Sequence, residues 1–526
     1  MGGRLTVLTG EGSESIEWSE AFSRADHVSR CMHSLGIGPG CTVMTAARTS
    51  LDHVLAIIGT WLAGAAVAVS AVPIHPRRSE ALRRRFERLS DSINPSLILG
   101  DADHLKTLLG ERGHRAKLLS EWLPGCASAR PRHAIESTWA GTGEDIAVAQ
   151  ATSGTTGFPK IALVPFRCLY ANIRSITDAI EADPHRDVAL SWLPLSHDMG
   201  LIGLFGVSMF TGADLFIADP SLFAANPANW MRWCSVYRAT VTGGPSFAYG
   251  IAAASMARRS SLDLSQLRLT MNGAEPVDVE TCRLFADAGA THGLQPESML
   301  AVYGMAEATL AVTFPALKEG LRADEVDREC LSRGQAVQSD SEKPQTSRRL
   351  ARLGRPVNGM ELRIRSETES TLGERQIGHV EIRGSSVIPG YLDQPFSDGA
   401  WFRTGDLGYV AEGDLVVCGR DKDLIVIAGR NIYPEEVERA LQSVAGVWRG
   451  NVAVFATSRN GREAIVIMAE AEDPAHQSLA RRLVTVGADW CDANIASVEL
   501  IDPGSIPKTP SGKVSRSGCR AKFEAR

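Results

Sequence analysis

The fold is decided by the stretch Ala151-Thr152-Ser153-Gly154-Thr155-Thr156-Gly157-Phe158-Pro159-Lys160, which follows a predicted strand at residues 146–149. Closely spaced glycines let backbone N–H groups approach phosphate oxygens, while hydroxyl groups and a lysine add donors and positive charge. The stretch is not a Walker A sequence, because Phe158 and Pro159 separate the last glycine from the lysine and no Ser or Thr follows that lysine. A plain Gly/Thr turn, the alternative, would need neither the hydroxyls nor the lysine. The expected phosphate-binding residues are Thr152, Ser153, Gly154, Thr155, Thr156, Gly157 and Lys160.

Short apolar runs alternate with longer amphipathic segments over roughly the first 300 residues, which is typical of βαβ units. Residues 42–45 precede a predicted helix at 51–62, and residues 66–71 precede one at 79–89. The sequence therefore predicts an α/β protein with parallel sheets covered by helices.

The pattern changes in the last third of the chain. From Met360 onward, short strand-like runs at 361–365, 379–383 and 414–418 predict a small β-rich subdomain. A new α+β pattern begins after Gly419-Arg420-Asp421-Lys422-Asp423. We therefore expect a large N-terminal domain, residues 1–421, and a small mobile C-terminal domain, residues 422–526. A polar stretch at about 318–352 is expected to be a mostly exposed insertion.

Bulk composition restricts the choice of partners. A net charge of −6 gives no general attraction to nucleic acid, and ten scattered cysteines without a C-x-x-C pair fit a reducing cytoplasm. The acidic N-terminus does not have the pattern of a signal peptide. Residues 54–74 are uncharged and long enough to span a bilayer, but Gly59, Gly64, Ser70 and Pro73 interrupt them, which favours a buried helix followed by a strand. A cytoplasmic protein that is not an integral membrane protein is expected.

Together with the phosphate-binding stretch, five further motifs resemble those of the adenylate-forming superfamily of acyl-CoA synthetases, luciferases and adenylation domains. Each motif is short, but their joint occurrence in the family's order covers nearly the whole chain. They are Asn272-Gly273-Ala274-Glu275-Pro276, Tyr303-Gly304-Met305-Ala306-Glu307, Trp401-Phe402-Arg403-Thr404-Gly405-Asp406, Gly419-Arg420-Asp421-Lys422-Asp423 and Pro507-Lys508-Thr509-Pro510-Ser511-Gly512-Lys513.

The resemblance implies ATP and Mg²⁺ as cofactors and a role for each motif. A carboxylate attacks the α-phosphorus of ATP, so the site must supply cations and donors where negative charge accumulates. By resemblance Lys513 stabilises that phosphorus, Glu307 holds Mg²⁺, and Lys422 is the hinge of the mobile domain. A solvated surface charge is the alternative for Glu307 and Lys513. The implied ATP- and AMP-binding residues are Gly273, Ala274, Glu275, Tyr303 against adenine, Gly304, Met305, and Asp406 and Arg420 at the ribose.

A further stretch, Trp192-Leu193-Pro194-Leu195-Ser196-His197-Asp198-Met199-Gly200-Leu201, is similar to that of the fatty acyl-AMP ligases. The resemblance places His197 near the substrate carboxylate, although a lone histidine is also a common structural residue. The same subgroup carries an insertion after the Glu307 motif that is thought to disfavour coenzyme A. A fatty acid substrate and an acyl carrier protein with a phosphopantetheine arm are therefore the implied partners.

Two other functions compete with this interpretation. A ligase that uses free coenzyme A would share the first step and differ only in the acceptor. A non-catalytic nucleotide-binding protein would be expected to have lost Lys513, Glu307 or Asp406, and all three are present.

Overall fold

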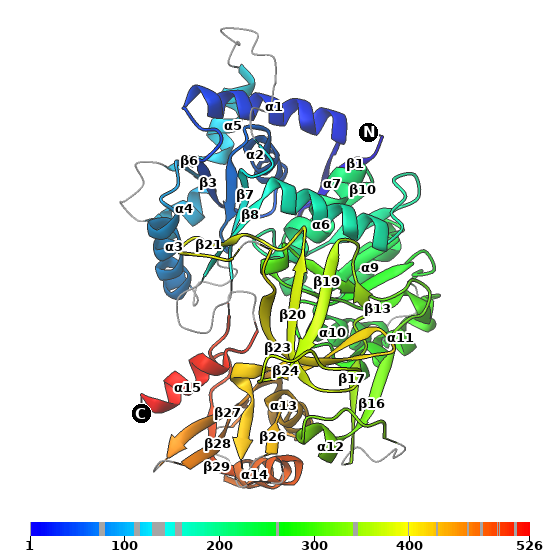
Figure 1. Ribbon diagram of the computed structural model, residues 1–526. Helices are drawn as coiled ribbons and strands as arrows, with labels where there is room; N and C mark the ends of the chain where they lie inside the picture. The colour runs from blue at the N-terminus through cyan, green and yellow to red at the C-terminus, as the bar shows by residue number, and fades with distance from the viewer. Residues whose placement is uncertain are drawn as a thin grey trace.

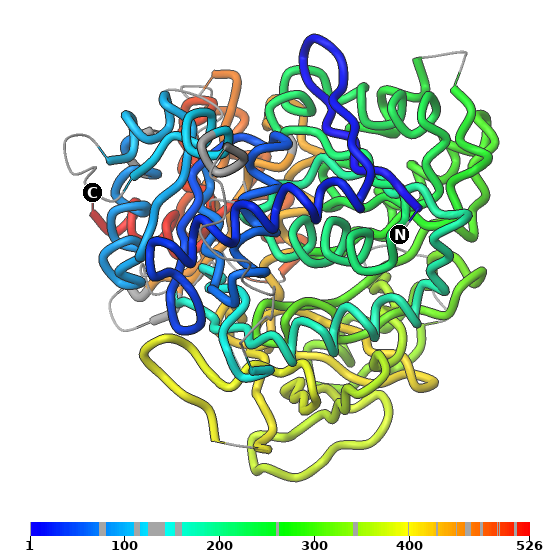
Figure 2. Tube along the Cα trace, turned by 90° about the horizontal axis from the view of Figure 1, so that it is seen from above, coloured from blue at the N-terminus to red at the C-terminus, as the bar shows by residue number. Residues whose placement is uncertain are grey.

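The computed structural model describes residues 2–72, 79–109, 116–128, 142–152, 160–258, 262–339, 346–397, 399–427, 430–459, 462–473, 477–491, 493, 495–509 and 513–525. Figure 1 shows the earlier segments, blue to green, stacked above a smaller orange and red part that contains the C-terminus. In the view from above, the blue and cyan segments and the green segments form two lobes, with the yellow segments along a third side (Figure 2).

Two large, mostly parallel sheets organise the N-terminal part, as the alternating pattern predicts. The described residues form a seven-stranded and an eight-stranded sheet. In the first the order is β13 (Met299–Ala301), β12 (Leu269–Asn272), β11 (Val241–Gly244), β9 (Val188–Ser191), β10 (Asp214–Ala218), β1 (Arg4–Leu8) and β2 (Ser13–Glu17). In the second it is β22 (Gln394–Pro395), β21 (Gly390–Tyr391), β8 (Ile161–Pro165), β7 (Ile146–Ala151), β4 (Ala66–Val69), β3 (Thr42–Ala46), β5 (Leu97–Gly100) and β6 (Ala116–Leu118).

Helices cover these sheets, and α2 (Leu51–Leu62) shows why they form where they do. Ser50 caps its N-terminus by accepting a hydrogen bond from the backbone N–H of His53, and nearly all its residues are buried. The uncharged stretch that begins at Val54 is thus part of a core helix followed by β4, as predicted. Within the described part of the chain, we find no helix long and apolar enough for a membrane span. The other helices of this part are α1 (Trp18–Ser34), α3 (Ser79–Ile93), α4 (Ala102–Leu109), α5 (Leu119–Ser128), α6 (Phe166–Ala179), α7 (Val207–Thr211), α8 (Pro220–Ala225), α9 (Asn229–Val236), α10 (Ser246–Met256) and α11 (Val279–Ala290).

The predicted β-rich region is a four-stranded antiparallel sheet, and the chain then enters a part with its own core. Hydrophobic clusters in this last part contain only residues from Ile425 onward. The four-stranded sheet comprises β19 (Met360–Arg365), β20 (Gly378–Gly384), β23 (Phe402–Ala411) and β24 (Asp414–Arg420). The last part comprises β25 (Ile425–Ile427), β26 (Arg430–Ile432), α13 (Pro434–Gln442), β27 (Val447–Arg459), β28 (Arg462–Ala471), α14 (Gln477–Cys491), β29 (Ile495–Ile501) and α15 (Arg516–Glu524).

The prediction that residues 318–352 are mostly exposed is wrong. This stretch contains an antiparallel hairpin of β16 (Ala323–Asp327) and β17 (Ser347–Ala351), with helix α12 (Arg328–Ser332) between its strands. Charged residues of the hairpin are buried as pairs, which explains why its polar composition misled the prediction: Asp324 is 1% exposed and Arg352 7%.

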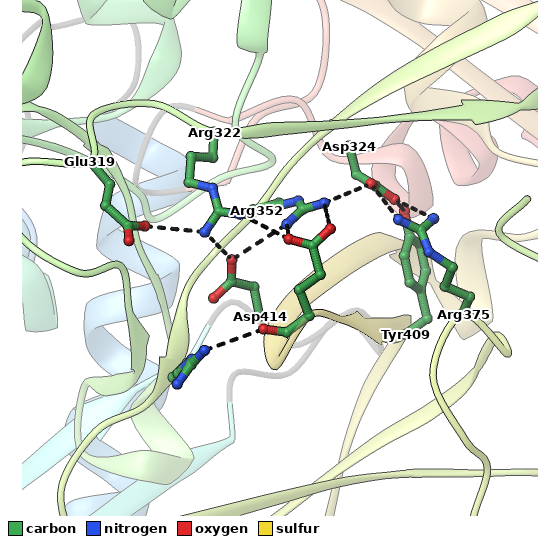
Figure 3. A network of polar contacts seen from close by, with 9 residues as sticks. Glu319, Arg322, Asp324, Arg352, Arg375, Tyr409 and Asp414 are labelled. Carbon is green, nitrogen blue, oxygen red and sulfur yellow. Dashed lines mark hydrogen bonds and ion pairs between the residues drawn. The ribbon is translucent and has the colours of Figure 1, made fainter. Parts of the chain in front are cut away.

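Figure 3 shows the network that binds this hairpin to the four-stranded sheet. Asp324 pairs with Arg352 and Arg375 at 3.2 and 2.9 Å and accepts a hydrogen bond of 2.6 Å from Tyr409. Burial alone would raise the pKa of Asp324, but these donors hold it below its ordinary value. Arg352 also pairs with Glu412 at 2.8 Å. The inserted hairpin is therefore fixed to the body of the N-terminal part.

Three short strands complete the framework beside the site. β15 (Ala311–Phe314) pairs with β14 (Tyr303–Gly304) on one side and with β18 (Arg355–Pro356) on the other. β14 therefore carries Tyr303 directly beyond the carboxyl end of β13.

Candidate active site

A cavity of about 810 Å³ lies where the carboxyl ends of the two parallel sheets face each other. Its lining includes residues that follow β3, β4 and β7 in one sheet and β9, β10 and β12 in the other. Ligands of α/β proteins bind at such carboxyl edges, because the loops that follow the strands converge there. The cavity therefore gathers sequence motifs that lie hundreds of residues apart, and it is the candidate active site.

Tyr303 and Arg420 line the cavity, and both contact Asp406. Asp406, on β23, accepts a hydrogen bond of 2.5 Å from the Tyr303 hydroxyl and pairs with the Arg420 Nε at 3.1 Å. Burial and the Asp406 carboxylate raise the pKa of Tyr303 well above its ordinary value. Burial disfavours the charge of Arg420, but Asp406, Tyr303, Asp423 and Glu307 together outweigh this and raise its pKa. The carboxylate is thus positioned to accept hydrogen bonds from a diol such as a ribose.

Lys513 reaches this cavity from the C-terminal part of the chain. Its Nζ donates a hydrogen bond to the Ala274 carbonyl, and its backbone N–H donates to the Thr509 hydroxyl at 3.2 Å. Burial lowers the pKa of Lys513, while the carboxylates of Glu275 and Asp198 oppose this shift. The structure therefore places the lysine inside the cavity, which is the arrangement required for it to meet a bound phosphate.

The motif Asn272 to Pro276 supplies the wall that Lys513 contacts. Ala274 has a φ of +67°, a conformation that is uncommon for a residue with a Cβ and that turns its carbonyl toward the lysine. Gly273 is required for close packing, because a Cβ there would lie 2.8 Å from the Val302 side chain. Glu275 accepts a hydrogen bond of 2.9 Å from the backbone N–H of Phe247, and burial raises its pKa.

His197 and Asp198 lie beside each other in the cavity wall, just before a π-helix at Met199–Gly206. The His197 Nδ1 lies 2.6 Å from Asp198 Oδ1, and Asp198 also accepts from the backbone N–H of Met199 at 2.7 Å. Burial would raise the pKa of Asp198, but His197, Met199 and Lys513 hold it below its ordinary value. Gln150 donates to the Ser196 carbonyl at 2.9 Å and so links this segment to β7. π-Helical turns are frequent at functional sites.

Glu307 lies in a short 3-10 turn, Ala306–Ala308, and accepts a hydrogen bond of 2.6 Å from the Tyr391 hydroxyl. Lys160 lies 4.5 Å from the centre of the Tyr391 ring. The described residues contain no cluster of three or more metal-ligating side chains. A single carboxylate fits Mg²⁺, which keeps several waters and takes its other ligands from substrate phosphates, and fits poorly with a metal that needs a full protein cage.

The structure places the other predicted site residues as follows. Gly304 and Met305 line the cavity beside Tyr303, and Lys422 lines it from a 3-10 turn at Asp421–Asp423. Burial, together with neighbouring Arg420, lowers the pKa of Lys422. Thr152 lines the cavity. Its backbone N–H donates a hydrogen bond of 2.8 Å to the Lys160 carbonyl, which joins the two ends of the predicted phosphate-binding stretch. Ser153, Gly154, Thr155, Thr156 and Gly157 lie outside the described residues.

The cavity residues that were not singled out from the sequence include Asp198, Tyr391 and Arg85. Asp198 stands in the quoted His-Asp-Met-Gly stretch, so its motif was the available signal. Tyr391 and Arg85 belong to none of the quoted motifs, and only the fold brings them to the cavity.

Comparisons with known proteins agree with this geometry. Residues 3–392 match the AMP-binding enzyme family. The medium-chain-fatty-acid–[acyl-carrier-protein] ligase JamA of Moorena producens is 31% identical over 505 residues, which cover 90% of this chain and 84% of that protein. The long-chain-fatty-acid–AMP ligase FadD26 of Mycobacterium marinum is 28% identical over 98% of this chain and 92% of its own.

A solved structure from studies of fatty acyl-adenylate ligases of E. coli and L. pneumophila superposes with a TM-score of 0.90 at 27% identity. The match covers 100% of this chain and 96% of that one.

Proposed function

The chain belongs to the AMP-binding enzyme family and is an adenylate-forming ligase, and on that premise we propose a two-step reaction. In the first step the enzyme activates a fatty acid with ATP to acyl-AMP and releases pyrophosphate. In the second it passes the acyl group to the phosphopantetheine thiol of an acyl carrier protein. The observation that carries the proposal is Lys513, which is inserted into the cavity that Tyr303 and Arg420, the two partners of Asp406, also line.

In the first step a carboxylate oxygen forms a bond to the α-phosphorus, and the bond from that phosphorus to the bridging oxygen of pyrophosphate breaks. The Lys513 ammonium stabilises the charge that develops on the phosphorus oxygens. Asp406 accepts hydrogen bonds from the ribose hydroxyls, Arg420 holds the Asp406 side chain in place, and Tyr303 lies against adenine. Glu307 would hold Mg²⁺, which when bound neutralises phosphate charge.

A fatty acid fits the cavity because much of its wall is apolar. Near His197 the wall is built by large apolar side chains, and Trp192 is stacked on Phe223 with 3.7 Å between ring centres. Apolar walls stabilise an acyl chain by removing its methylene groups from water, at about 0.8 kcal/mol for each one. The other apolar wall residues of this region include Leu204, Ile251 and Met271.

The proposal of a carrier-protein acceptor is supported by the contacts between the inserted hairpin and the C-terminal part. Arg348, on β17, pairs with Glu436 of α13 at 2.6 Å. Arg328, on α12, pairs with Glu436 at 3.5 Å, and its guanidinium lies 4.0 Å from the centre of the Trp490 ring. Because the other side of the hairpin is fixed by the Asp324 network, these contacts would restrain rotation of residues 422–526 about Lys422.

We expect Arg328→Ala to release part of this restraint. The cation–π contact with Trp490 is worth about 1 kcal/mol, so acyl transfer to coenzyme A should rise about fivefold while adenylation is nearly unchanged. The matched control is Arg333→Ala, because Arg333 follows the same helix and pairs with Glu329 at the surface. Acyl-CoA formation is measured in single turnovers from supplied acyl-AMP. Equal rates of acyl-CoA formation in both variants would show that the hairpin does not determine which acceptor is used.

The proposed function is tested with the purified enzyme, ATP, Mg²⁺ and a panel of fatty acids. Mass spectrometry follows acyl-AMP with coenzyme A or a phosphopantetheinylated carrier protein added in parallel. We expect acyl-AMP to accumulate with coenzyme A and to be consumed by the carrier protein. Rapid formation of acyl-CoA would instead favour the coenzyme A ligase, and no acyl-AMP with any acid would reject fatty acid activation.

A further inference from the structure

Helix α3 contributes one wall of the cavity through a stripe of three side chains. Leu82, Arg85 and Leu89 line the cavity, and their spacing of three and four residues places them on one face of the helix. None of the motifs identified from the sequence includes this helix. Arg85 is therefore a charged group of the cavity without an assigned role.

Arg85 differs from its neighbours on the same helix in having no counter-ion. Arg83 pairs with Glu80 and Glu87 at 3.0 and 2.6 Å, and Arg84 pairs with Glu80 at 2.9 Å. Among the described residues Arg85 has no ion-pair or hydrogen-bond partner, and burial, with no neighbouring charge to oppose it, lowers its pKa. A half-buried guanidinium without a partner costs free energy, which an anionic ligand would offset.

The position of Arg85 in the cavity indicates which anion that is. The same cavity is lined by Ala71 and Val72, which follow β4, by Thr152, which follows β7, and by Lys160. These are residues at the carboxyl edge of the eight-stranded sheet, where the two ends of the phosphate-binding stretch meet.

The cations already assigned lie elsewhere. Arg420 is held by Asp406, where the nucleoside is expected, and Lys513 contacts Ala274. A bound triphosphate carries most of its charge on the β- and γ-phosphoryl groups. Lys160 faces the Tyr391 ring. Arg85, which lines the cavity from α3, is therefore available to bind the β- and γ-phosphoryl groups.

We propose that Arg85 binds the β- and γ-phosphoryl groups of ATP and the pyrophosphate that they become. The inference rests on the proposed adenylation reaction. When the carboxylate oxygen bonds to the α-phosphorus, the bridging oxygen leaves with the electron pair and the new negative charge resides on pyrophosphate. Arg85 donates hydrogen bonds to that leaving group, while Lys513 acts at the α-phosphorus. A guanidinium suits this task because its N–H groups can bind phosphate oxygens in pairs.

The test compares Arg85→Gln with Arg84→Gln, whose side chain is exposed, lies outside the cavity lining and pairs with Glu80. Affinities of the full chain for pyrophosphate, ATP and AMP are measured by calorimetry in the presence of Mg²⁺. We expect Arg85→Gln to lower the affinities for pyrophosphate and ATP about tenfold or more. The affinity for AMP should not change, because AMP lacks the phosphoryl groups that Arg85 contacts. Arg84→Gln should match the unmodified enzyme for all three ligands.

Arg85→Lys should recover most of the pyrophosphate affinity, and this variant serves if the glutamine variant fails to fold. Unchanged pyrophosphate affinity in Arg85→Gln would overturn the proposal, and a changed preference among acids with unchanged pyrophosphate affinity would assign Arg85 to the acyl chain. Equal loss of AMP and pyrophosphate affinity would also overturn it. Because pyrophosphate binding requires no acyl-AMP, an enzyme that binds pyrophosphate through Arg85 but activates no fatty acid would refute the proposed function alone.

Discussion

Lys513→Ala is expected to lower the rate of adenylation about 10²- to 10³-fold. The ammonium is a positive charge that the C-terminal part inserts beside Ala274, and burial away from water makes its interaction with a developing phosphorane charge strong. Alanine cannot replace that charge. The measurement is the rate of pyrophosphate release with a fatty acid and ATP.

Transfer of the acyl group from supplied acyl-AMP to the carrier-protein thiol should survive in the same variant, because no phosphorus is attacked in that step. Lys508→Ala is the matched control, since Lys508 precedes Lys513 in the same segment and lies outside the cavity lining. Near-normal pyrophosphate release by the Lys513 variant would show that the lysine is not needed for adenylation. Loss of both steps would indicate damage to the fold.

Much of the framework could be predicted from the sequence, because its elements carry strong local signals. The helix predicted at 51–62 has those bounds, since Ser50 caps it and its apolar residues continue to the end. The strand predicted at 414–418 is longer, Asp414–Arg420, because pairing with β23 extends it through Gly419 and Arg420. Local sequence identifies such elements, while tertiary pairing sets their length.

The inserted hairpin shows where composition misleads. A polar stretch indicates exposure only when its charges are solvated, and here Asp324, Arg348 and Arg352 are buried because they find partners on other elements. Those partners, such as Arg375 and Tyr409, lie elsewhere in the chain, so no local pattern contains them.

Some residues of the candidate site could likewise be predicted from the sequence, and others could not. Motif residues such as Tyr303, Asp406 and Lys513 could be selected from the sequence. In the structure Tyr303 and Lys513 line one cavity, and Asp406 is hydrogen-bonded to Tyr303. Arg85 could not, because an arginine in the run Arg83-Arg84-Arg85 resembles a solvated helix face. Only the way in which α3 packs in the fold shows that Arg85 lines the cavity, whereas Arg83 and Arg84 pair with glutamates of the same helix.

Asp406→Ala is expected to weaken ATP binding about 10- to 100-fold. The carboxylate is 4% exposed and has both the Tyr303 hydroxyl and Arg420 as partners, so its removal takes acceptors from the ribose and leaves two polar groups without their partner. Dissociation constants for ATP and AMP are measured by calorimetry. Asp421→Asn is the control, because Asp421 is more exposed and pairs with Arg403 instead of with Tyr303 and Arg420.

Comparison of ATP with AMP distinguishes the two ends of the proposed nucleotide site. Both ligands contain the ribose, so Asp406→Ala should lower the affinities for ATP and AMP by the same factor. Arg85→Gln should lower the affinity for ATP and leave that for AMP unchanged. An Asp406 variant that binds ATP normally would count against the ribose role of this carboxylate. A variant that loses ATP but retains AMP would place Asp406 at the phosphates instead, which its contacts with Tyr303 and Arg420 oppose. The pair of variants therefore tests the orientation of the nucleotide in the cavity as well as each residue.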